Sequence, residues 1–131
     1  MIKILKYHWR AILWLVVIVI GSLLPGDNLP ATSIFARIPH FDKMVHFILY
    51  FTFTLFLMSG FSRQYKNNSG FKKKAYVYSF IIAFLLGASI EFIQEHVGRS
   101  YDEMDMIANT TGIAVSLLLF NPIKWILRNI L

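Results

Sequence analysis

Three short stretches of the chain carry polar side chains at spacings that place them on one face of a helix. In the first stretch, Asp42, His46 and Tyr50 are four residues apart, and Lys43 lies beside them. Residues four apart in a helix lie above one another, so these three side chains share a face. A histidine oriented by a carboxylate is suited to general base catalysis, and a lysine is suited to holding an anion.

The other two stretches supply carboxylates, amides and a guanidinium. The second consists of Glu91 and Gln94, which share a face near the end of an apolar segment. The third opens the next apolar segment, with Arg99 followed by residues that again share one face: Asp102, Asp105, Asn109 and Gly112. All seven acidic residues of the chain lie at the ends of apolar segments. Ionisable groups at such positions usually pair with one another or mark a functional site.

These stretches give two overlapping sets of candidate site residues. The candidates for catalysis are His46, Asp42, Glu91 and Asp105. The candidates for ligand binding are Lys43, His46, Tyr50, Gln94, Arg99, Asp102 and Asn109. A divalent metal held by His46, Glu91 and Asp105 is a variant of the catalytic hypothesis. Since the chain has no cysteine and no H-x-x-x-H or D-x-D pattern, we assign no metal and no cofactor.

Each of these residues also has a purely structural interpretation. The alternatives are a satisfied core histidine at His46, a charge pair of Asp42 with Lys43, a helix cap at Asp102, and a salt bridge of Glu91 with Arg99. Taken together, so many polar groups exceed what short helices need for cohesion. Their number favours a site.

The elements that position these side chains are membrane-spanning helices. The 131 residues are 56% hydrophobic, with a mean hydropathy of +0.57, which is typical of a polytopic membrane protein. Four segments predict an all-α, four-helix transmembrane bundle in a single domain of residues 1–131, with helices at 7–24, 44–61, 75–95 and 104–121. We expect the first to be a true helix and not a cleaved signal peptide, because no small-x-small site follows Leu24.

The distribution of charge predicts the topology. The two termini and the loop of residues 62–74 carry ten basic residues and no acidic ones, whereas the other connections carry three basic residues and all seven acidic ones. Basic residues are enriched on the cytoplasmic side, so both termini should be cytoplasmic. We expect the basic loop to anchor at anionic lipid and assign no nucleic-acid partner.

This topology places the three polar stretches at the outer ends of their helices. We expect them to face one another and to form a polar cup open to the outer surface, made of Asp42, Lys43, His46, Tyr50, Glu91, Gln94, Arg99, Asp102, Asp105 and Asn109. Asp27, Glu95 and Glu103 should face water. Small residues at Ala83, Gly87, Ala108, Gly112 and Ser116 predict close helix packing.

Three local features complete the predicted architecture. Asp102 is a candidate N-cap of the fourth helix. Asn121-Pro122 should end that helix, so that residues 123–131 form a short amphipathic tail at the inner interface. A short re-entrant turn around Ile34-Phe35 would fit the long first outer loop.

The three stretches, in this order and spacing, resemble the VanZ-like family. The matching elements are Asp42-Lys43-x-x-His46-Phe-x-x-Tyr50, Glu91-x-x-Gln94, and Arg99-x-x-Asp102-x-x-Asp105-x-x-x-Asn109-x-x-Gly112, together with Ser22-Leu-Leu-Pro25. The resemblance implies a small multi-pass protein of the bacterial cytoplasmic membrane. The family's namesake is associated with low-level resistance to teicoplanin, which points to lipid-linked envelope material.

Three functions remain open from the sequence. The first is binding or modification of an envelope lipid or lipid-linked glycan in the polar cup, where Lys43, Arg99 and His46 would hold an anionic head group. The second is a membrane-embedded hydrolase or transferase that uses His46 and carboxylates. The third is an accessory or scaffold subunit of a larger envelope complex, with lipid-facing phenylalanines as partner surfaces: Phe47, Phe51, Phe53, Phe56, Phe80 and Phe84.

Overall fold

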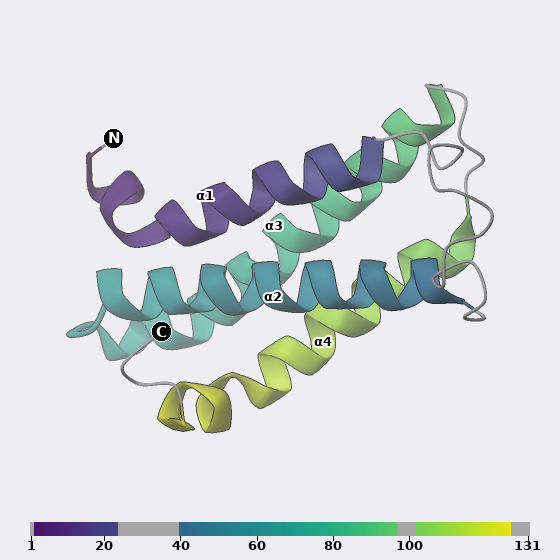
Figure 1. The fold of residues 1–131 in the computed structure, drawn as a ribbon. Coiled ribbons are helices and arrows are strands. Elements are labelled where there is room, and N and C mark those ends of the chain that lie inside the picture. The colour runs from purple at the N-terminus through teal and green to yellow at the C-terminus, as the bar shows by residue number, and fades with distance from the viewer. Residues whose placement is uncertain (1, 24–39, 97–101, 127–131) are drawn as a thin grey trace.

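Four helices make up almost all of the described structure (Figure 1). The computed structural model describes residues 2–23, 40–96 and 102–126. The helices are α1 (Ile2–Leu23), α2 (Phe41–Gln64), α3 (Ser69–His96) and α4 (Glu103–Ile126), and each contains a stretch long and apolar enough to cross a membrane. The predicted all-α membrane bundle is therefore confirmed.

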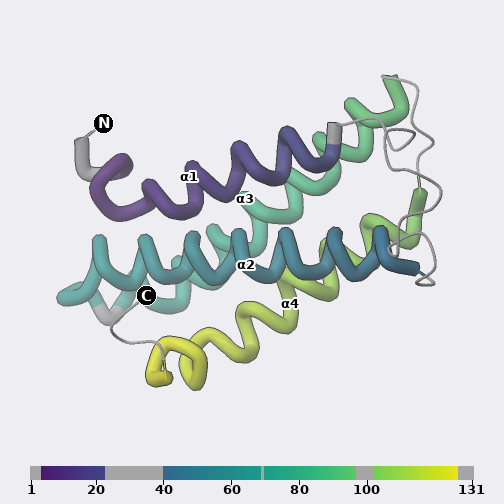
Figure 2. Tube along the Cα trace, viewed as in Figure 1, coloured from purple at the N-terminus to yellow at the C-terminus, as the bar shows by residue number. Residues whose placement is uncertain are grey.

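The helices run side by side along the bundle, and α2 touches each of the other three (Figures 1 and 2). The last residues of α1 and α3 lie at the same end of the bundle as the first residues of α2 and α4 (Figure 1). We call this the acidic end, because it carries Asp42, Glu91, Asp102 and Asp105. The opposite, basic end carries Arg63, Lys66, Lys72 and Lys124.

The most extensive interface lies between α2 and α4, which run parallel to each other. Contacts along its length keep nearly one register: Lys43 meets Asp105, His46 meets Asn109, and at the basic end Lys124 donates a hydrogen bond to Ser62. Each pair is separated by 62 or 63 residues in the sequence. A single alignment of the two helices therefore determines which polar groups face each other.

The bundle buries polar as well as apolar side chains and exposes many apolar ones. Its buried polar side chains include His46, Glu91 and Asn109, whereas many aliphatic and aromatic side chains are exposed, Leu118 at 79% for example. This inversion is expected where hydrocarbon replaces water around the helices. One of the predicted lipid-facing phenylalanines is an exception, because Phe53 is only 1% exposed and belongs to the core. That prediction was wrong at Phe53, since three helices surround the middle of α2.

The helices are longer than the predicted uncharged spans. For example, α1 begins at Ile2 instead of residue 7, and α3 begins at Ser69 instead of residue 75. Lysine, arginine and glutamine are good helix formers, so the helices continue into their charged flanks. The predicted end at residue 121 was also wrong, because α4 continues through Pro122 to Ile126. Proline removes one backbone donor but need not end a helix. The rest of the predicted tail and the turn at Ile34-Phe35 lie outside the described residues.

Small residues allow a very close contact between α2 and α4. A Cβ atom added to Gly112 would lie 2.4 Å from the carbonyl oxygen of Phe47 and 3.1 Å from the amide nitrogen of Phe51. Because both of these atoms belong to the backbone of α2, no rotation of a side chain could relieve the clash. The predicted packing role is thus confirmed at Gly112, on which the α2–α4 alignment depends.

We predict that Gly112→Ala destabilises the bundle by about 1–3 kcal/mol, the usual cost of overpacking a tight contact. The measurement is thermal unfolding of the purified protein in detergent. The matched control is Gly21→Ala in α1, where an added Cβ would meet nothing within 4 Å. Gly21→Ala should leave the midpoint unchanged or raise it, since alanine favours a helix. Equal effects of the two substitutions would contradict the tight contact.

Candidate functional site

The upper part of the polar cup is a cluster of three carboxylates around one ammonium group. Lys43 Nζ lies 2.7 Å from Asp42 Oδ2 and 2.7 Å from Asp105 Oδ1, and it also donates a hydrogen bond to Asp102. The Lys43 side chain is partly exposed at 21%, and the Asp42 side chain is 51% exposed at the rim. A bound anion would have to displace these carboxylates. The cluster therefore does not favour Lys43 as a phosphate ligand.

Asp102 joins the start of α4 to α2. Its Oδ1 accepts a hydrogen bond from the backbone amide of Met104 at 2.8 Å, which confirms the predicted N-cap. The ammonium of Lys43 donates a hydrogen bond to the same carboxylate and, together with that amide, lowers the pKa of Asp102 below its ordinary value of 3.8. The ionised form of Asp102 is therefore the one that the fold stabilises.

The lower part of the polar cup is built around His46, which is buried on α2. His46 Nδ1 lies 3.0 Å from Asn109 Oδ1, and His46 Nε2 lies 3.6 Å from Asp105 Oδ2. An amide oxygen only accepts hydrogen bonds, so Nδ1 carries the hydrogen. The lone pair of Nε2 then points toward a carboxylate oxygen, which is also an acceptor. A positive group between these two acceptors, either a proton or a metal ion, would stabilise this arrangement.

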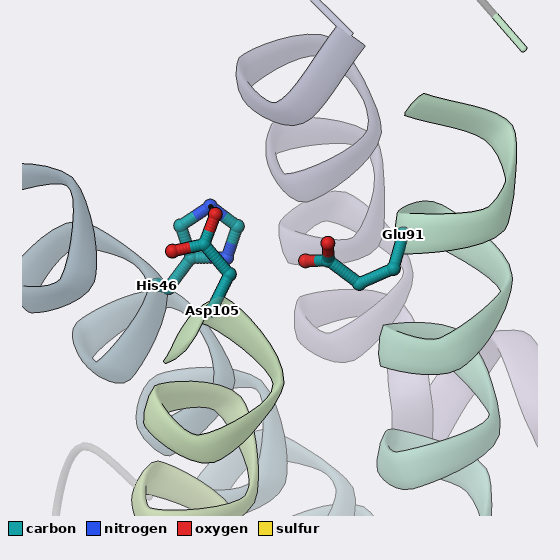
Figure 3. A group of neighbouring side chains, drawn as sticks. All are labelled: His46, Glu91 and Asp105. Carbon is teal, nitrogen blue, oxygen red and sulfur yellow. Dashed lines mark ion pairs between the residues drawn. The ribbon is translucent and has the colours of Figure 1, made fainter. Parts of the chain in front are cut away.

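A second carboxylate approaches this pair from α3. Glu91 is 2% exposed and points its carboxylate toward His46 and Asp105 (Figure 3). One potential ligand atom from each of His46, Glu91 and Asp105 lies within 4.8 Å of the others. Three helices thus bring one imidazole and two carboxylates to one buried place, and we call these three residues the HED triad.

The remaining predicted site residues have different surroundings. Gln94 does not join the HED triad in any described contact; its amide donates a hydrogen bond to the backbone carbonyl of Ser22 at 2.7 Å and so ties α3 to α1. The hydroxyl of Tyr50 and the amide nitrogen of Asn109 are buried and have no hydrogen-bond partner among the described residues. Arg99 lies outside the described residues.

An apolar groove beside the polar cup was not predicted. It has a volume of about 430 Å³ and lies between α2 and α4. Lys43 lines one part of it, and its apolar lining residues are Met44, Phe47, Ile48 and Ala108. The spacing of Met44, Phe47 and Ile48 shows that they share a helix face, but only the packing of α4 against α2 shows that this face borders a groove.

Comparison with protein families decides the classification. A model of the family described as VanZ/LLP1 matches residues 4–127, which is nearly the whole chain. The chain belongs to the VanZ/LLP1 family. This match confirms the resemblance seen in the sequence. No curated protein and no solved structure matches the chain. Family membership and four apolar helices together describe a VanZ-like multi-pass membrane protein.

The lowered pKa of Asp102 predicts how the stability of this VanZ/LLP1 member depends on pH. A carboxyl whose pKa is lower in the folded state stabilises the fold above its unfolded pKa, and this contribution is lost as the pH falls through the folded pKa. Wild-type protein should therefore be more stable than Asp102→Asn at about pH 7, and the two should converge as the pH falls below the ordinary carboxyl pKa and through the lowered pKa of Asp102. Thermal unfolding midpoints measured across this range test the prediction.

The control for this comparison is Glu103→Gln, which removes the neighbouring exposed carboxylate. Its curve should follow that of the wild type. Parallel curves for wild type and Asp102→Asn, with no convergence at low pH, would show that the contact with Lys43 contributes no pH-dependent stability.

Proposed function

We propose that this VanZ-like protein binds the hydroxyl-rich head of an envelope lipid, such as a lipid-linked glycan, in the polar cup. The observation that carries the proposal is the surplus of hydrogen-bond acceptors there. Among the described residues, Asp42, Asp102, Asp105 and Glu91 outnumber the single cation Lys43. Sugar hydroxyl groups donate to carboxylates, whereas a bare phosphate would be repelled by them.

The groove beside the polar cup supports a ligand that is a lipid. Lys43 borders both the carboxylate cluster and the groove, so a polar head and an apolar chain could lie side by side at this position. Pockets that bind small ligands combine apolar walls with a few placed polar groups. In our proposal, the apolar chain follows the groove between α2 and α4 while the head occupies the polar cup.

We further propose that the protein lies in the bacterial cytoplasmic membrane, with both termini in the cytoplasm and the acidic end outside. The positive-inside rule supports this orientation, because the basic end carries Arg63, Lys66, Lys72 and Lys124. An outward-facing cup would meet the envelope material to which teicoplanin-type glycopeptides are directed. The association of the family's namesake with teicoplanin resistance is consistent with that location.

Mass spectrometry of lipids that co-purify with the protein tests the binding proposal. Wild-type protein should carry one enriched glycan-bearing lipid, and Asp105→Asn should lower its amount roughly tenfold, the effect of about 1.4 kcal/mol. Glu103→Gln, at an exposed position two residues away on α4, should retain it.

A second pair of variants tests the groove without altering the polar cup. Ala108→Phe should fill the groove and exclude the lipid, whereas Ala114→Phe, on an exposed face of the same helix, should not. Equal lipid content in wild type, Asp105→Asn and Ala108→Phe would leave the polar cup as a purely structural network, as expected for a scaffold subunit.

Labelling of introduced cysteines tests the proposed orientation, because the chain has no cysteine of its own. Glu95→Cys places a thiol near the acidic end, and Asn67→Cys places one in the connection between α2 and α3. A membrane-impermeant maleimide added to intact cells should label Glu95→Cys only, and disruption of the cells should expose Asn67→Cys. The reverse pattern would overturn the orientation.

A further inference from the structure

We propose that the HED triad binds one divalent transition-metal ion, with His46, Glu91 and Asp105 as its protein ligands. The donors are already close, since one ligand atom from each residue lies within 4.8 Å of the others. A first-row ion bonds such donors at about 2.0–2.2 Å, so two ligand atoms of one ion are at most roughly 4.4 Å apart. Small side-chain movements would close that difference, and the three helices need not move.

The orientation of His46 favours an ion in this place. In the neutral imidazole, a hydrogen bond from Nδ1 to Asn109 Oδ1 leaves Nε2 without a hydrogen, and Nε2 lies 3.6 Å from Asp105 Oδ2. Metal-binding histidines commonly donate their other ring N–H to a carbonyl or carboxylate, which fixes the tautomer. Asn109 would have this supporting role. An ion between Nε2 and Oδ2 would also relieve the contact of two acceptors.

Asp105 has one oxygen free for such an ion. Lys43 contacts Oδ1, whereas Oδ2 faces His46. The carboxylate therefore belongs both to the cluster around Lys43 and to the HED triad. The HED triad offers one imidazole nitrogen and two carboxylates, a donor set that suits a divalent cation.

Two further polar groups at the HED triad point to a ligand. Tyr50 follows His46 by one helical turn, and its hydroxyl is fully buried, within electrostatic reach of Glu91, and without a hydrogen-bond partner among the described residues. The amide nitrogen of Asn109 is also buried without a hydrogen-bond partner among the described residues. The side chains of Tyr50 and Asn109 both border Gly87. Buried polar groups are normally satisfied, so water molecules on a bound ion would supply the missing partners.

The donor set indicates the class of metal. One imidazole and two carboxylates, without thiolate, suit Mn²⁺, Fe²⁺ or Zn²⁺ better than Ca²⁺ or Mg²⁺, which prefer oxygen ligands throughout. The proposal does not depend on which lipid enters the polar cup, because all three ligands belong to the chain itself. It can therefore be tested on protein from which lipid has been removed.

Manganese binding to the full-length protein in detergent, after treatment with a chelator, tests the site. Free Mn²⁺ gives a strong electron paramagnetic resonance signal that weakens on binding, and wild-type protein should remove one Mn²⁺ per chain from solution. Glu91→Gln should weaken binding by roughly tenfold or more. The matched control is Glu95→Gln, the same change one turn further along α3 at an exposed position, which should bind like the wild type.

A spectroscopic measurement on wild-type protein keeps the test independent of whether a variant folds. Electron spin echo modulation of bound Mn²⁺ should show coupling to the nitrogen of one imidazole, and added Zn²⁺ should displace the Mn²⁺. Binding of neither ion, bound Mn²⁺ without nitrogen coupling, or equal losses in Glu91→Gln and Glu95→Gln would each overturn the proposal. If neither Mn²⁺ nor Zn²⁺ binds, a proton would lie between His46 and Asp105.

Discussion

The structure depends on one constraint: charged side chains, and polar ones that their own helix does not satisfy, cannot face hydrocarbon, so those within the spans must face one another. The exposed surface of α1, α3 and α4 is accordingly rich in aliphatic and aromatic side chains, while His46, Glu91, Asp105 and Asn109 are buried between helices. The exposed surface is therefore apolar, unlike that of a soluble bundle, although an apolar core is also present. The constraint also makes the polar interior a specific structure, because each buried group must find a complementary partner or lose several kcal/mol of solvation.

The contact at Gly112 fixes how α4 is aligned against α2. Since the backbone of α2 lies directly against Gly112, a larger side chain at this position would force α4 away from α2. The pairs of His46 with Asn109 and of Lys43 with Asp105 follow one and two turns closer to the acidic end. At the basic end, Lys124 and Ser62 keep nearly the same register. The tight packing and the site are thus parts of one interface, so a disturbance of either should affect the other.

The polar cup has two parts with different chemical properties. Around Lys43, one cation is shared by three carboxylates at short distances. Such a cluster holds the start of α4 to α2 and offers spare acceptor atoms at its exposed rim. Around His46, in contrast, two acceptors face each other and neighbouring polar groups lack described partners. The first part is suited to orienting a ligand at the surface, and the second is suited to holding a small positive group below it.

The sequence by itself determined that the chain forms four membrane helices and that Asp42, His46, Glu91, Asp102 and Asp105 belong to one end of the bundle. These conclusions depend on hydrophobic length and on the helical repeat, both of which are local properties. The sequence could not determine that Gln94 binds the backbone of α1, that Lys43 is surrounded by carboxylates, or that a groove lies beside Lys43. Nor could it show that α4 continues beyond Pro122. The tertiary structure decided these points, because partners far apart in the sequence are set by how closely two helices approach and in which register.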